Sequence, residues 1–302
     1  MDMYPVLPVP QSGTFYEYAP KMMAFEFNGF SSKKTLVFIG GLGDGFATLP
    51  YLPALSTSLN KIGWSVVQIY IRSSYIGWGS GSLKRDAEDI SQLVSFLRSE
   101  AGGKREKIVI MGHSTGCQDT MQYASKFEQK SSTKANGYIL QAGASDREAA
   151  LGVGIPLEEL EKSVELAKTM IAAGRENEIM PYEYCSSFLD CPISAYRWNA
   201  LYSVRGDDDF FSTYLTPEDH AKTWGKVNEP ILVVFSGSDE FVPKSVDKVK
   251  LLDDWKSATD SKYWSPLSKP VPGARHNVGV GSEKGALEDL VATVTKFLED
   301  TF

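Results

Sequence analysis

The sequence predicts an α/β fold in which a mostly parallel central sheet has helices on both faces and carries an inserted helical cap. Short runs of β-branched and aliphatic residues alternate with segments of helical periodicity along most of the chain. Residues 145–225 interrupt this alternation, because they show helical periodicity but no strong strand. The 302 residues, 42% of them hydrophobic, are enough to fill the core of one large domain.

The expected strands are apolar on both faces, which is typical of parallel strands covered by helices on each side. They span residues 34–39, 64–71, 107–111, 137–140 and 230–235, with a last strand around 262–264 and beyond. Helices are expected over 83–97, with Ser82 as N-cap, and over 117–127. This alternation of strands and helices defines the α/β class.

Residues 145–225 are expected to form a cap over the sheet edge, inserted into a core domain of residues 1–144 and 226–302. A helix over 157–171 would end just before Gly174, and many aromatic residues follow it. Most of these aromatics should pack the cap against the core. The last helix, over 287–297, has one apolar face and should pack on the core domain.

The charge and residue counts exclude several classes of protein. With 38 acidic and 31 basic residues and a net charge of -7, the chain lacks the basic face that a nucleic-acid binder needs. Three His and three Cys argue against a metal site and exclude a disulfide scaffold, and no cofactor is expected. Cys185 and Cys191 should remain thiols.

The chain start lacks the features of a signal peptide, and no apolar run approaches the length of a membrane span. We therefore expect a cytoplasmic protein without a membrane partner.

Residues Gly112-His113-Ser114-Thr115-Gly116 match the G-x-S-x-G nucleophile elbow. The pattern is short, but a strand leads into it and a helix leads out, as the motif requires. The sharp turn lifts the serine oxygen clear of the backbone, and the glycines avoid collisions with neighbouring chain. Ser114 is thus the candidate nucleophile.

A serine hydroxyl needs a base, usually His, to take its proton. His113 lies inside the elbow, where its ring cannot easily turn back onto Ser114, and His220 lies in a polar stretch expected to face solvent. His276 lies in a loop between the last strand and the last helix. Elimination therefore favours His276 as the base.

The acid that orients this base should lie between Ser114 and His276 in chain order. Asp239 comes just past the carboxyl end of a buried strand, where catalytic groups gather in α/β sheets. Glu240 is a nearby alternative, and Asp146 is a more distant one.

Developing negative charge on the substrate oxygen needs preorganised donors. We expect one to be the backbone N–H of Thr115 and the other to be the N–H of Leu42, in the glycine-rich turn after residue 39. This turn matches neither a P-loop nor G-x-G-x-x-G, so an oxyanion hole is favoured over a nucleotide site.

Four segments, residues 38–45, 75–79, 112–119 and 145–148, carry a resemblance to the α/β-hydrolase superfamily and, within it, to the fungal siderophore (fusarinine C) esterase family. The extended elbow, with Cys117-Gln118-Asp119, is its specific part. The resemblance implies a Ser114, Asp239 and His276 triad, and hydrolysis of ornithine esters in a fusarinine-type hydroxamate siderophore to release iron inside the cell.

A cationic substrate would suit the acidic run Asp207-Asp208-Asp209, which we expect either to line the entrance or to be a solvated loop. Asp44, in the glycine-rich turn, is a further candidate contact for substrate. Two alternative functions stay open: a carboxylesterase or lipase-like hydrolase of another substrate, and a hydrolase-fold binding protein with negligible turnover. In every case the partner is a small molecule.

Overall fold

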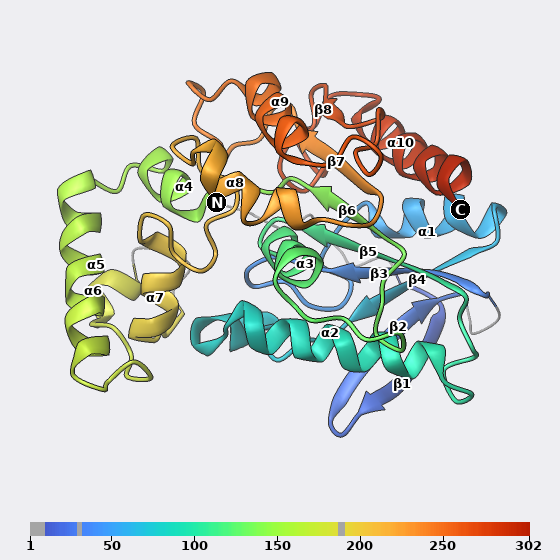
Figure 1. Cartoon of the computed structure of the whole chain (residues 1–302), viewed down its shortest axis with the longest axis horizontal. Coiled ribbons are helices and arrows are strands. Elements are labelled where there is room, and N and C mark those ends of the chain that lie inside the picture. Colours follow the sequence, from blue (N-terminus) through green and yellow to red (C-terminus); the bar gives the residue numbers. More distant parts are fainter. Residues whose placement is uncertain (1–9, 29–31, 187–190) are drawn as a thin grey trace.

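A computed structural model describes residues 10–28, 32–186 and 191–302. Its centre is an eight-stranded sheet within these residues, in the order β1-β2-β4-β3-β5-β6-β7-β8 (Figure 1). The strands from β4 to β8 across this sheet run parallel, while β1 and β2 pair antiparallel. The fold is that of an α/β hydrolase, as the sequence predicts.

The strand positions agree with the prediction in the centre of the sheet and differ at its edges. The structure has β3 (Lys34–Ile39), β4 (Trp64–Ile69), β5 (Lys107–His113), β6 (Gly137–Gln141) and β7 (Ile231–Ser236). It adds β1 (Gly13–Ala19) and β2 (Met22–Phe27), which the sequence analysis did not identify.

The expectation of a last strand around 262–264 is wrong. Trp264 forms only an isolated bridge to Ile231, and the last strand is β8 (Lys269–Val271). Residues from Asp260 form a turn, closed by a hydrogen bond from Tyr263 N–H to Asp260 O, which delays the strand.

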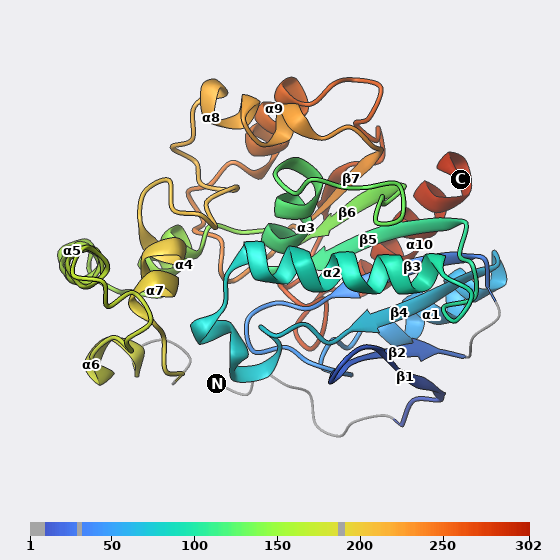
Figure 2. The ribbon, with the colours of Figure 1, turned by 60° about the horizontal axis from the view of Figure 1, so that its bottom comes forward.

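Helices cover both faces of the sheet, and each face has its own apolar core (Figure 2). One face carries α1 (Leu52–Lys61) and α10 (Ala286–Thr301), which contact each other. The other carries α2 (Leu83–Arg98), α3 (Gly116–Ser125) and α9 (Lys248–Ala258). As expected, Ser82 caps α2, its hydroxyl accepting from the N–H of Arg85.

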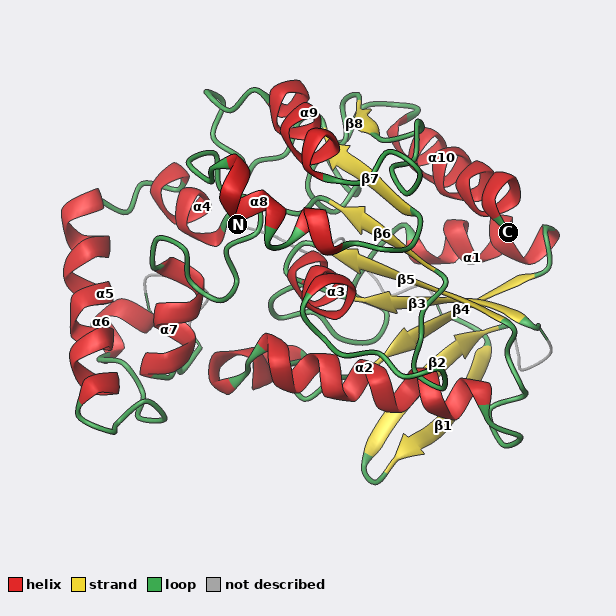
Figure 3. Ribbon diagram, viewed as in Figure 1, coloured by secondary structure: helices red, strands yellow, loops and turns green. Residues whose placement is uncertain are grey.

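Residues 145–225 form α4 (Asp146–Gly152), α5 (Leu157–Ala172), α6 (Tyr182–Cys185), α7 (Ala195–Tyr202), α8 (Pro217–Ala221) and the short η2 (Trp224–Lys226). In Figure 3 the arrowheads of β3 and β5 to β7 point toward the side where α4 to α7 lie. Helices α4 to α7 therefore stand beyond the carboxyl ends of the parallel strands.

Two parts of this segment pack differently. Residues between Ala150 and Tyr202 share an apolar cluster with Trp78 of η1 (Tyr75–Ser80). Phe210 and Trp224 instead belong to the core on the α2, α3 and α9 face.

No helix within the described ranges is both long and apolar enough to cross a membrane.

Candidate active site

Ser114 lies at the sharp turn between β5 and α3, in the left-handed backbone conformation with φ +53°. Such a φ is strained for a residue with a side chain, and strain of this kind is typical of a nucleophile elbow. A Cβ at Gly112 would lie 2.0 Å from the carbonyl oxygen of Gly116, and one at Gly116 would lie 2.5 Å from that of Ile39. The turn therefore requires glycine at both positions.

The structure brings Ser114, His276 and Asp239 together in one hydrogen-bonded chain. His276 Nε2 lies 2.8 Å from Ser114 Oγ, and its Nδ1 lies 2.8 Å from Asp239 Oδ2. The other oxygen of Asp239 accepts from the N–H of Phe241 at 3.0 Å. Because a carboxylate only accepts, Nδ1 carries the proton and Nε2 offers its lone pair to the serine hydroxyl.

Burial alone would lower the pKa of His276, since it penalises the charged ring. The Asp239 carboxylate outweighs this effect through its charge and its hydrogen bond, with smaller contributions from Glu240 and Asp44. The net pKa is raised above the ordinary value of 6.5. A site of this kind stabilises the imidazolium that forms when the ring takes a proton.

The two alternative acids, Glu240 and Asp146, form hydrogen bonds with groups other than the His276 ring. Glu240 Oε2 accepts from the backbone N–H of His276 at 2.9 Å and lies 3.2 Å from Arg275 Nε. Asp146 Oδ2 accepts from Gln118 Nε2 at 2.9 Å. Burial, with the nearby Asp208, raises the pKa of Asp146 to about 7.

The other two histidines are placed away from the serine hydroxyl. The His113 ring lies 5.0 Å from the His276 ring between centroids, and its Nδ1 pairs with Gln141 Oε1. Burial and the His276 charge lower the pKa of His113 to about 4, so it stays neutral. The expectation that His220 faces solvent is wrong. It is buried at the end of α8, which packs against α9, and burial lowers its pKa.

Gln141, the last residue of β6, is a central residue that the sequence analysis missed. Its amide donates to Ser236 Oγ at 3.0 Å and to the His276 carbonyl at 3.3 Å, while its Oε1 accepts from Tyr51 Oη at 3.1 Å. Its carbonyl accepts from the N–H of Ser114 at 3.0 Å. A polar residue at the carboxyl end of a buried strand is the signal that could have identified it.

The glycine-rich turn after β3 lies directly beside the elbow. A Cβ at Gly41 would lie 2.6 Å from Ser114 Cβ, and the N–H of Gly41 donates to Asp44 Oδ2 at 2.8 Å. The N–H of Leu42, expected to face the substrate oxygen, donates to Thr115 Oγ1 at 2.8 Å. In this structure the backbone N–H of Leu42 is therefore already hydrogen-bonded to the Thr115 hydroxyl.

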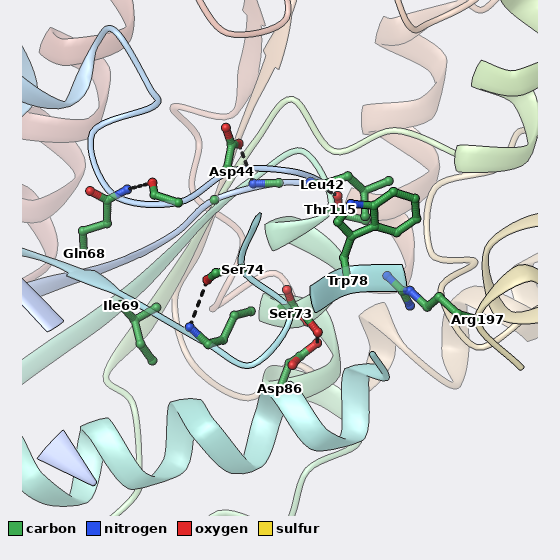
Figure 4. Close-up of a pocket in the computed structure, with 15 residues that line it drawn as sticks. Leu42, Asp44, Gln68, Ile69, Ser73, Ser74, Trp78, Asp86, Thr115 and Arg197 are labelled. Carbon is green, nitrogen blue, oxygen red and sulfur yellow. Dashed lines mark hydrogen bonds between the residues drawn. The ribbon is translucent and has the colours of Figure 1, made fainter. Parts of the chain in front are cut away.

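A cavity opens beside this turn (Figure 4). Its lining combines the turn with the end of β4, the loop after it and η1, and with α2, α7 and the start of α3: Gly40, Gly41, Leu42, Asp44, Gly45, Gln68, Ile69, Ile71, Ser73, Ser74, Trp78, Asp86, Thr115, Asp119 and Arg197. Asp44 thus lines the cavity, as a substrate contact would.

For the acidic run 207–209 we expect either an entrance lining or a solvated loop, but only Asp207 of the three aspartates is exposed. Asp208 is buried, and both of its oxygens lie 2.7 Å from Arg197 Nη1. Asp209 accepts hydrogen bonds from the hydroxyls of Ser212 and Tyr214, and exposed Asp207 accepts from Tyr196 Oη at 2.7 Å. The aspartates are held by neighbouring donors because this loop folds back on α7.

Sequence and structure comparisons connect the chain to esterases. It is 39% identical to UPF0613 protein PB24D3.06c of Schizosaccharomyces pombe, over 92% of this chain and 94% of that protein. It is 32% identical to fusarinine C esterase sidJ of Aspergillus fumigatus, over 95% of each chain. The structure of siderophore hydrolase EstB from A. fumigatus is similar with a TM-score of 0.81 and 30% identity, covering 97% of this chain and 98% of that one.

These relatives support an α/β hydrolase that acts on esters. The family described as a protein of unknown function (DUF1749) matches residues 4–299, so nearly the whole chain is covered. The chain belongs to this family, and it is similar to fungal siderophore esterases.

Proposed function

We propose that the protein is a serine esterase with Ser114 as nucleophile, His276 as general base and Asp239 as the acid that orients it. The observation that carries the proposal is the hydrogen-bonded chain from Ser114 through His276 to Asp239, with both contacts at 2.8 Å. This order of groups is the one that acyl transfer by serine requires.

In the first step, Ser114 Oγ attacks the ester carbonyl carbon while its proton passes to His276 Nε2. The C–O bond to the alcohol then breaks, and Nε2 returns the proton to the leaving alkoxide. Water repeats the sequence on the acyl-enzyme and frees the acid. Asp239 keeps its negative charge throughout and stabilises the imidazolium.

We propose that the N–H groups of Thr115 and Leu42 stabilise the oxyanion. The N–H of Leu42 would then change partner, from Thr115 Oγ1 to the substrate oxygen, as the tetrahedral intermediate forms. Gly41 allows the turn to lie close enough to Ser114 for this exchange.

The proposed substrates are ornithine esters of a fusarinine-type hydroxamate siderophore, whose cleavage releases iron. The names of fusarinine C esterase sidJ and siderophore hydrolase EstB support this class, and both matches span nearly the whole chain. We further propose that residues 145–225 act as a cap, since the helices from α4 to α7 stand at the carboxyl ends of the strands. A cytoplasmic location fits the free thiols of Cys117 and Cys185.

Product analysis tests this function. The purified protein is incubated with ferric fusarinine C and with 4-nitrophenyl acetate, beside the Ser114→Ala variant. We expect hydrolysed ornithine esters with the wild type and a loss of at least about 10³-fold in the variant. Cleavage of the nitrophenyl ester alone would indicate another substrate. Turnover of neither ester would indicate a binding protein.

A further inference from the structure

The side chain of Gln141 joins the central sheet to the loop that carries His276. Gln141 is the last residue of β6, which runs between β5 and β7 (Figure 1). Alternate side chains of a strand point to the same face, and Ile139 belongs to the apolar core on the α1 and α10 face. Gln141 therefore places a carboxamide at the end of this apolar face, where the residue is 1% exposed. A buried amide is costly unless its polar atoms are paired.

The carboxamide of Gln141 is a junction of four hydrogen bonds. Its Nε2 donates to the carbonyl oxygen of His276 at 3.3 Å and to Ser236 Oγ at 3.0 Å. Its Oε1 lies 3.1 Å from Tyr51 Oη and also pairs with Nδ1 of His113. These partners come from the loop after β8, the end of β7, the N-cap of α1 and the end of β5. One side chain thus connects four separate segments of the chain.

The His276 carbonyl fixes the orientation of this amide. A carbonyl oxygen can only accept, so the NH₂ group must face it and Oε1 must face the other way. Two donors meet Oε1 there, the hydroxyl of Tyr51 and the ring of His113. Nδ1 of His113 therefore carries the proton, and the junction holds the His113 ring in one tautomer.

His276 is held at its main chain as well as at its ring. Its carbonyl oxygen accepts from Gln141 Nε2 and, at 3.3 Å, from Ser236 Oγ. Two rings pack against its imidazole, that of His113 with centroids 5.0 Å apart and that of Phe241 with centroids 4.7 Å apart. Gln141 controls two of these contacts, because it bonds the carbonyl directly and holds the His113 ring through Oε1.

We propose that Gln141 is a positioning residue for the base: its carboxamide sets the place of the His276 main chain and, through His113, the place of the His276 ring. This inference rests on the proposed function, in which His276 Nε2 takes the proton of Ser114 Oγ across 2.8 Å. The side chain of Gln141 bonds to no reacting atom, so its effect passes through the two histidines. A displacement of about 1 Å can lower a rate by about 100-fold.

Gln141→Met tests the carboxamide, because methionine is unbranched and flexible and lacks the amide. The main-chain carbonyl of residue 141 still accepts from the N–H of Ser114, so only the side chain leaves the junction. In hydrolysis of 4-nitrophenyl acetate we expect kcat to fall by about 10- to 100-fold while KM stays within about twofold. KM is retained because acylation and deacylation both use His276 and slow together.

Gln129→Met is the matched control. The amide of Gln129, in the loop after α3, also joins three groups: it donates to the Tyr123 carbonyl and to Tyr138 Oη, both at 2.8 Å, and it accepts from the N–H of Ala135 at 3.2 Å. Tyr138 belongs to the core on the opposite face of the sheet from the Gln141 side chain. Urea unfolding should show a loss of stability in both variants, but Gln129→Met should keep kcat within about twofold. Equal kcat values in the two variants would overturn the proposal.

Two results separate this inference from the proposed function. Ester hydrolysis that disappears in Ser114→Ala supports the esterase whatever Gln141→Met does. If Gln141→Met does not fold, Ser236→Ala decides, since it removes one of the two donors to the His276 carbonyl. Its kcat should fall by about 3- to 10-fold, and an unchanged kcat would overturn the proposal.

If the wild type cleaves no ester, the proposed function fails, and NMR tests the position of the His276 ring without catalysis. The chain has three histidines, so isotope-labelled histidine gives few ring signals. The Nδ1 resonance of His276, whose N–H is bonded to Asp239, should shift in Gln141→Met and keep its wild-type position in Gln129→Met. A resonance that moves in both variants or in neither would refute the positioning role.

Discussion

Replacing Asp239 by asparagine tests the proposed base most sharply, because the structure dictates how the new amide would turn. Asp239 accepts from two donors, the ring Nδ1–H of His276 at 2.8 Å and the N–H of Phe241 at 3.0 Å. An asparagine has only one oxygen, and the backbone N–H of Phe241 cannot change its role. The amide oxygen therefore turns to Phe241, and the NH₂ group turns to His276.

This orientation inverts the imidazole. Facing an NH₂ donor, Nδ1 must accept, so the proton moves to Nε2 and points at the Ser114 hydroxyl. A base that already holds its proton cannot take another from serine at neutral pH. We expect kcat to fall by about 10⁴-fold, equivalent to roughly 5.4 kcal/mol of lost transition-state stabilisation. Steady-state hydrolysis of 4-nitrophenyl acetate measures the loss.

Asp146→Asn is the matched control. Asp146 is a half-buried carboxylate that accepts from the side-chain amide of Gln118, and it is the more distant candidate for the role of Asp239. This variant should keep kcat within about threefold, since its amide oxygen still accepts from Gln118. Retention of more than a tenth of the activity in Asp239→Asn, with an intact circular dichroism spectrum, would refute the tautomer argument. A fall in Asp146→Asn as large as in Asp239→Asn would refute the choice of acid.

Two further predictions concern the base and the elbow. His276 must be neutral to act, so kcat/KM should rise with pH through a pKa above 6.5. Glu240→Gln should move this acid limb to lower pH, because it removes a negative charge that helps to raise this pKa. A pH–rate profile measures the shift, and a limb that moves upward would contradict the sign. Gly41→Ala should lower kcat by about 100-fold, because its Cβ would lie 2.6 Å from Ser114 Cβ. Gly43→Ala is the matched control, because no atom lies within 4 Å of its Cβ. This variant should lose only about 1 kcal/mol of folding free energy, owing to the positive φ of residue 43. Equal kinetic losses in the two alanine variants would show that the turn, and not the contact with Ser114, controls activity.

The sequence predicted the centre of this protein because its signals are local. Apolar runs identify β3 to β7, and the elbow motif brings its own strand and helix with it. His276 could be singled out because the chain has three histidines, and loops after parallel strands meet at one edge of the sheet.

The misplaced residues depend on long-range contacts that no local pattern encodes. His220 lies in a polar segment, yet α9 covers it. Asp208 belongs to an acidic run, yet it is buried. Its charge is compensated there by Arg197, 11 residues earlier in the chain. β1 and β2 were missed because their pairing with each other and with β4, more than their composition, makes them strands. Gln141 offered only a weak signal, since a single polar residue at a strand end has many possible uses.

The hydrogen bonds of Gln141 have a consequence for local motion. The carbonyl of His276 is anchored to the Gln141 amide, and the N–H of Ser114 is anchored to the Gln141 carbonyl. The loop that carries the imidazole therefore cannot fray alone, because opening it breaks a side-chain bond inside the central sheet. Amide hydrogen exchange should accordingly show that the N–H of Ser114 is protected to nearly the free energy of global unfolding. Turns between a strand and a helix usually open far more easily. The proposed nucleophile and the proposed base would then be lost together, in one cooperative step.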